Sequence, residues 1–196
     1  MSRSPLEQLR PAASVLVWLL FAGCVSTEPR PTVQNVPKAR ELFPLAVGNR
    51  WSYNVAFLGA RQNLTVAIVS GQGSLFVDSR NQKFMLESDG LRDEHRYLLK
   101  EPLEVGRTWT SIIDVSTSEH YKVDELGVRI DVPAGHFEDC VQIEARNPSG
   151  PNLALIADQV YCPGVGLVRV VTFQERSGNR SAPQFTQELA SYKVQQ

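Results

Sequence analysis

The 196-residue sequence has little charge imbalance and no hydrophobic stretch long enough to cross a bilayer. Its 20 basic and 21 acidic residues give a net charge of −1, and no block of like charges occurs. Such an even balance argues against nucleic acid as a partner. The longest apolar run lies within about residues 12–22, whereas a membrane-spanning helix needs roughly 20 residues. A permanent transmembrane helix is therefore not expected.

Motifs for catalysis and for metal binding are also missing. No Gly-x-Ser-x-Gly nucleophile motif occurs. The three histidines, His95, His120 and His136, lack the close spacing typical of a metal site. We read Glu119-His120, with Asp124 nearby, as a solvated hairpin end. The sequence predicts a protein that is not an enzyme and needs no cofactor or metal.

The N-terminus carries Arg3 and Arg10, then the apolar run, which ends in Leu20-Phe21-Ala22-Gly23-Cys24. This order is typical of a secretory signal peptide, and the last five residues resemble a bacterial lipobox. The resemblance implies cleavage before Cys24, a diacylglyceryl thioether on its sulfur, and acylation of the new N-terminus, for example with palmitate. The alternative is an ordinary signal peptide with a chance cysteine.

The expected organisation has three parts. Residues 1–23 are the lipoprotein signal peptide, residues 24–40 the lipid anchor and a disordered tether, and residues 41–196 a single domain. The membrane link is then the lipid on Cys24. Because Val25 rather than aspartate follows this cysteine, we expect an outer-membrane anchor with the domain facing the periplasm.

Alternating apolar and polar residues dominate the sequence from Arg50 onward. Trp51, Tyr53 and Val55 alternate with polar or small residues, and similar segments recur between turn signals such as Glu125-Leu126-Gly127. Only residues 38–42 suggest a helical turn. We predict an all-β domain of about 10–11 antiparallel strands, in a curled meander sheet or a partly open barrel.

Two cysteines remain once Cys24 is assigned to lipid. Cys140 and Cys162 form an even pair in an oxidising compartment, which favours a disulfide. Such a bond would close a loop of about 22 residues and contribute about 3 kcal/mol to stability. The alternative is two buried free thiols, which pack as small hydrophobic side chains.

Three spaced motifs, Phe43-Pro44-Leu45-x-x-Gly48-x-x-Trp51-x-Tyr53, Val132-Pro133-Ala134-Gly135-x-Phe137-x-x-Cys140 and Tyr161-x-Pro163-Gly164-Val165-Gly166-Leu167-Val168, cover much of the mature chain. Together they resemble the TapB-like family of bacterial secreted or lipid-anchored β-rich proteins of unknown function. The resemblance implies no catalytic residues. Cys162 replaces the small residue expected there, which favours its pairing with Cys140. We interpret the motifs as strand ends and core aromatics; the alternative is the wall of a ligand groove.

Three functions follow from these observations. The first is a non-enzymatic binding or scaffold module that docks an envelope protein. The second is a carrier of an apolar or lipid-like ligand in a concave β-sheet, and the third is an unrecognised hydrolase. The first two differ in whether the barrel interior is filled or open. The inward side chains that decide this include Trp51, Tyr53, Val128, Ile130, Val141 and Ile143.

Overall fold

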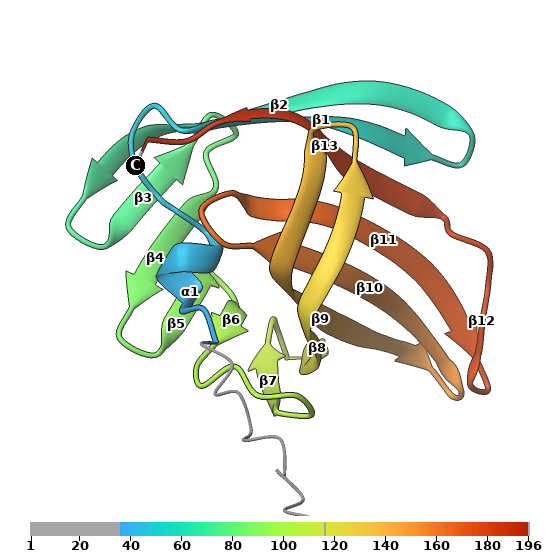
Figure 1. Cartoon of the computed structure of the whole chain (residues 1–196). Helices are drawn as coiled ribbons and strands as arrows, with labels where there is room; N and C mark the ends of the chain where they lie inside the picture. The colour runs from blue at the N-terminus through green and yellow to red at the C-terminus, as the bar shows by residue number, and fades with distance from the viewer. Residues whose placement is uncertain (1–35, 116, 196) are drawn as a thin grey trace, which may run out of the picture. The chain divides into compact units, whose positions relative to one another are not determined.

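The structure, a computed structural model, describes residues 36–115 and 117–195. The signal peptide, Cys24 and most of the tether lie outside these residues. The described residues form one compact unit that is nearly all β (Figure 1). In this part of the chain a short helix precedes thirteen strands: α1 (Ala39–Leu42), β1 (Arg50–Phe57), β2 (Ala60–Gln72), β3 (Leu75–Asp78), β4 (Lys83–Glu87), β5 (Gly90–Asp93), β6 (Tyr97–Lys100), β7 (Thr108–Ile112), β8 (Ser118–Val132), β9 (Gly135–Gly150), β10 (Leu153–Cys162), β11 (Gly166–Arg176), β12 (Asn179–Arg180) and β13 (Phe185–Lys193).

All strands belong to one antiparallel sheet with the order β6-β5-β4-β3-β2-β1-β13-β11-β10-β9-β8-β7, and β12 pairs with β11. The order is a meander except at β13, which lies between β1 and β11 and so joins the two halves. The sheet curls into a nearly closed barrel (Figure 1). The two end strands, β6 and β7, leave an unsealed seam. The predicted all-β class and the partly open barrel are confirmed.

One predicted turn is wrong. Residues 125–127 do not end a strand, because β8 runs without interruption through them. The register of β8 against β9 shifts at Val123/Glu125 and again at Leu126/Val128, and Gly127 has a φ of +72°. Extra residues in a long strand are absorbed as bulges that bend it. The glycine therefore marks a bend in the barrel wall rather than a hairpin.

Aromatic rings fill one end of the barrel. Phe43, which follows α1, stacks on Trp51 with ring centroids 5.6 Å apart and meets the edge of Tyr161 at 6.3 Å. The ring centroid of Phe84 on β4 lies 5.5 Å from that of Phe43. All four side chains are buried. Residues from distant parts of the chain thus form one aromatic cluster, which makes this end of the interior solid.

Hydrogen bonds tie the first motif to the third. The Trp51 indole Nε1 donates to the backbone oxygen of Val165 at 2.6 Å, and the Tyr53 hydroxyl donates to that of Leu167 at 3.0 Å. Gly166 lies between these acceptors with a φ of +115°, and a Cβ there would stand 3.2 Å from Trp51 Nε1. The motifs therefore have a structural role in this cluster.

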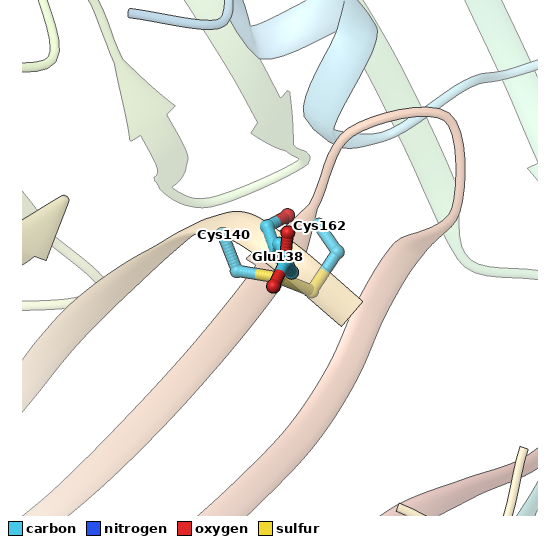
Figure 2. Close-up of a disulfide and its surroundings, with 3 residues drawn as sticks. All are labelled: Glu138, Cys140 and Cys162. Carbon is cyan, nitrogen blue, oxygen red and sulfur yellow. A yellow bond between two sulfur atoms is a disulfide. The ribbon is translucent and has the colours of Figure 1, made fainter. Parts of the chain in front are cut away.

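A disulfide joins Cys140, next to the part of β9 that pairs with β10, to Cys162 at the end of β10 (Figure 2). Its sulfur atoms are 2.02 Å apart and its Cα atoms 4.2 Å apart. The neighbouring residues Val141 and Tyr161 are direct partners in the sheet, so the bond links two facing positions on adjacent strands. Both cysteines are buried. The bond therefore fastens the two strands beside the aromatic cluster.

Candidate functional site

A cavity of about 370 Å³ lies inside the barrel, between β8–β11 on one side and β4 and β6 on the other. Its size falls in the range of small-molecule sites in proteins. Apolar side chains make up most of its lining, and Leu155 at its edge is 40 % exposed. The interior is thus filled at the aromatic cluster and hollow farther along the strands.

Small side chains in the sheet create this space. Ala145 of β9 and Ala157 of β10 are direct partners and both line the cavity. The next partners on either side are Tyr121 of β8 and Thr172 of β11. Directly paired residues project to the same face of a sheet. Two adjacent alanines therefore leave a hollow beside the larger Tyr121 ring, which stacks on Trp109 at 5.2 Å.

A charged cluster lies at the cavity wall next to the seam. Arg96, in the turn between β5 and β6, donates from Nη1 to both carboxylate oxygens of Glu119 at 2.9 and 2.8 Å. Its Nε donates to Asp93 Oδ2 at 3.1 Å. Glu119 belongs to β8, so the ion pair crosses from one end of the sheet to the other. Arg96, Glu119 and Asp93 are hereafter the seam cluster.

The surroundings of Arg96 and of the neighbouring Tyr121 shift the pKa of both side chains. Burial lowers the pKa of Arg96, but the neighbouring Tyr121, Glu119 and Asp93 outweigh it and raise the pKa overall. Burial and a hydrogen bond to Glu119 raise the pKa of Tyr121, whose hydroxyl donates to Glu119 Oε2. Arg96 therefore stays charged and Tyr121 stays neutral at physiological pH.

Three side-chain amides line the same cavity: Gln82, Asn147 and Gln159. The Tyr161 hydroxyl donates to Gln159 Oε1 at 2.6 Å, and burial raises the pKa of this phenol. That bond occupies the Gln159 oxygen and leaves its NH₂ group as a donor. The cavity thus combines an apolar surface with uncharged hydrogen-bonding groups.

Side chains bridge the seam in place of a backbone ladder. The Trp109 indole Nε1 on β7 donates to the backbone oxygen of Tyr97 on β6 at 3.0 Å, and the Tyr97 backbone N–H donates to Ser111 Oγ at 3.3 Å. These bonds hold β6 and β7 together, and the Arg96–Glu119 pair joins the β5–β6 turn to β8. The seam is therefore the part of the cavity wall with the weakest backbone support.

The three histidines do not come together. His95 lies exposed in the turn before β6, and His120 contacts Thr110 Oγ1 at 3.0 Å on the exposed face. His136 Nδ1 lies 2.8 Å from Asp131 Oδ1 in the β8–β9 hairpin. Among residues 36–115 and 117–195, no group of three His, Cys, Asp or Glu side chains is placed to hold a metal ion.

The prediction of a solvated hairpin end is correct for His120 and wrong for Glu119. Both residues lie at the start of β8 beside the β7–β8 turn, and His120 is exposed, but the Glu119 side chain is only 14 % exposed. Strand alternation contained the signal, since Glu119 shares the parity of the buried Tyr121 and Val123. No comparable signal marked Arg96, because its role depends on β6 and β8 meeting across the seam.

The fold and the cavity define a small antiparallel β-barrel with a ligand-sized interior space. No known protein family matches the chain, and no curated protein matches it. The resemblance to the TapB-like family stays a prediction. No helix in the described part of the chain is long and apolar enough to span a membrane.

Two crystal structures are similar to this chain. One is a protein from Bacteroides fragilis described as exported, with a YmcC-like fold, at 14 % identity and a TM-score of 0.44, over 77 % of this chain and 98 % of that chain. The other is a protein from Parabacteroides distasonis described as a lipoprotein, at 14 % identity and a TM-score of 0.42, over 78 % of this chain and 98 % of that chain.

Proposed function

We propose that the protein is a non-enzymatic lipoprotein of the bacterial cell envelope that carries a small apolar or lipid-like molecule inside its β domain. The observation that carries this proposal is the cavity of about 370 Å³, with Ala145 and Ala157 in its wall. A concave, mainly apolar space with a few placed polar groups is the usual form of a small-molecule site.

The side chains that line the cavity support binding over chemistry. They include no serine, cysteine or histidine. The one carboxylate among them, Glu119, is held by Arg96 and Tyr121, so it is not free to act as a general base. These features favour a carrier over the hydrolase considered above.

The lipobox supports the proposed location. Lipid on Cys24 would hold the protein at a membrane, and Val25 after it favours the outer membrane with the domain in the periplasm. Two or more acyl chains anchor a protein firmly, at about 0.8 kcal/mol per buried CH₂. A carrier tethered in this way would exchange its ligand close to a lipid surface.

Docking of an envelope protein is the second candidate. The end of β7 and the residues after it expose two apolar side chains, Ile112 at 77 % and Val115 at 108 % of their reference areas. This candidate rests on these two exposed apolar side chains, which lie close together in the sequence. Crosslinking in intact cells would test this candidate, because the Ile112→Ser, Val115→Ser variant should lose any partner that binds there.

Native mass spectrometry of residues 25–196, expressed in a bacterial periplasm, tests the carrier. We expect an additional mass that leaves on denaturation. The Ala157→Trp variant fills the cavity and should show the protein mass only, whereas Val69→Trp, at an exposed position, should keep the additional mass. A wild-type spectrum that shows only the protein mass, also after incubation with an envelope lipid extract, would count against the carrier.

A further inference from the structure

The charges at the cavity wall restrict which molecule can enter. We infer that the cavity selects an amphiphile with an uncharged polar head, such as a hydroxyl, ester or amide, and discriminates against a fatty-acid-like anion. This inference rests on the proposed function and narrows it to a chemical class.

The charged groups at the cavity wall carry more negative than positive charge. Arg96 and Glu119 are the charged residues in the cavity lining, and they form an ion pair at 2.8 Å. Asp93, which holds Arg96 Nε at 3.1 Å, is 4 % exposed. The seam cluster therefore carries one cation and two anions, so its net charge is −1.

The Arg96 guanidinium is already engaged by the carboxylates of the seam cluster. Arg96 already donates three hydrogen bonds to carboxylate oxygens, one to Asp93 and two to Glu119. A buried ligand carboxylate needs a partner charge of its own. It would have to compete with Glu119 and Asp93 for the same guanidinium and would meet their repulsion. The only cation in the lining of this cavity is thus already paired with two carboxylates, so an anionic head meets no unpaired positive charge there.

Uncharged amide side chains in the cavity wall can bind a neutral polar head. The amides of Gln82, Asn147 and Gln159 line the cavity and can donate to and accept from an uncharged head without a desolvated charge on either side. The remaining wall is apolar, with Leu98, Leu167 and Val170 among its residues. This combination suits a molecule with an alkyl or ring body and one neutral polar end.

Size gives a further limit. The cavity of about 370 Å³ lies at the small end of the range of small-molecule sites. A medium-length alkyl chain fits this space, and a larger head can extend past the exposed Leu155 edge. Monodecanoylglycerol and decanoate are therefore matched probes that share a ten-carbon acyl chain and differ in head charge.

The test is a displacement titration on the lipid-free mature chain, whose described residues form one compact unit. The uncharged dye 1-N-phenylnaphthylamine reports binding by its fluorescence at pH 7.5. We expect monodecanoylglycerol to displace the dye with a Kd at least tenfold lower than that of decanoate. Equal or tighter binding of decanoate would overturn the inference while leaving the carrier intact. Absence of any dye or lipid binding would overturn both.

The Glu119→Gln variant tests whether the charge of the seam cluster, rather than the shape of the cavity, causes the discrimination between the two probes. Glu119→Gln keeps the shape of the side chain and brings the seam cluster to net zero. We expect the ratio of the decanoate Kd to the monodecanoylglycerol Kd to fall at least threefold in this variant, and to stay unchanged in Val69→Trp. An unchanged ratio in folded Glu119→Gln, checked by circular dichroism, would overturn the electrostatic cause. If this variant does not fold, the wild-type ratio still decides the inference.

Discussion

At the residue scale, single hydrogen bonds connect parts of the sequence that are far apart. Trp51 and Tyr53 on β1 donate to the backbone of Val165 and Leu167, more than a hundred residues later. The Trp51 bond is buried and the Tyr53 bond is partly buried, so the loss of either leaves an acceptor that is at least partly shielded from water. These residues explain why the first and third motifs occur together.

Tyr53→Phe tests one such bond. The change removes only the hydroxyl that donates to Leu167 O, so we expect a loss of about 1–2 kcal/mol in the free energy of unfolding, measured with urea. The control is Tyr192→Phe, at a side chain 43 % exposed, which should change stability by less than about 0.5 kcal/mol. Equal effects at both positions would contradict the role of Tyr53.

Gly166→Ala tests the close approach of backbone to indole. A residue other than glycine is strained at a φ of +115°, and its Cβ would press on Trp51 Nε1 at 3.2 Å. Gly178→Ala is the control, since its φ is +82° but no heavy atom lies within 4 Å of the added Cβ. We expect Gly166→Ala to lower the free energy of unfolding by at least about 1 kcal/mol more than the control does. A smaller cost at Gly166 would show that the contact relaxes freely.

At the element scale, the β8–β9 and β9–β10 hairpins build most of the cavity wall. Their register places Tyr121, Ala145 and Ala157 in one row across three strands. A slip of one residue would turn every inward side chain outward. The disulfide and the hairpin turns are therefore the features that protect the cavity.

Removal of the disulfide should weaken this wall. The Cys140→Ala, Cys162→Ala variant should lose about 3 kcal/mol in the free energy of unfolding, because a cross-link over a separation of 22 residues restricts the unfolded chain. Chemical denaturation with and without reductant measures the effect. The variant should not respond to reductant, whereas the wild type should. A loss below about 1 kcal/mol would mean that sheet pairing already supplies the constraint.

The β8–β9 turn should contribute stability that depends on pH. A hydrogen bond to Asp131 raises the pKa of the exposed His136 above its usual value of 6.5. Its contribution is complete below pH 6.5 and is lost as pH rises through the raised pKa. Asp131→Asn should therefore lower Tm at pH 5.5 and have little effect at pH 9. Asp139→Asn in the same hairpin is the control; a similar pH-dependent loss there would assign the effect to general charge.

At the scale of the whole molecule, the barrel is closed by side chains where its two end strands meet. Trp109, Ser111 and the Arg96–Glu119 pair bridge β6, β7 and β8. Edge strands without a full ladder open more easily than central strands. The seam is thus the expected place for the first opening of the cavity.

Trp109→Phe tests the seam. The change keeps an aromatic ring against Tyr121 but removes the indole bond to Tyr97 O. Hydrogen exchange followed by mass spectrometry should show protection in β6 and β7 falling at least tenfold, while the central strand β10 in the same variant keeps its protection. Unchanged exchange in β6 would show that the Arg96 ion pair is sufficient to hold the seam.

Much of the fold could be predicted from alternation along the chain, and little of the site could. The pattern around Trp51 and Tyr53 predicted a half-buried strand correctly, and these side chains are 1 % and 4 % exposed. The turn predicted at residues 125–127 failed because bulges and turns use the same glycine signal. Glu119 was predicted to be solvated because it lies beside a turn, and its burial depends on Arg96 reaching it across the seam.

Alternation along the chain was enough to predict strands with one buried face from Arg50 onward, because side chains in a strand alternate with a period of two. The lipobox and its lipid stay a prediction of the same sequence. Three features became visible only in the folded chain: β13 joins the two halves of the sheet, Arg96 reaches Glu119 across the seam, and two facing alanines leave a cavity. Those features depend on the pairing and register of strands far apart in sequence, and no local pattern encodes the distance between their side chains.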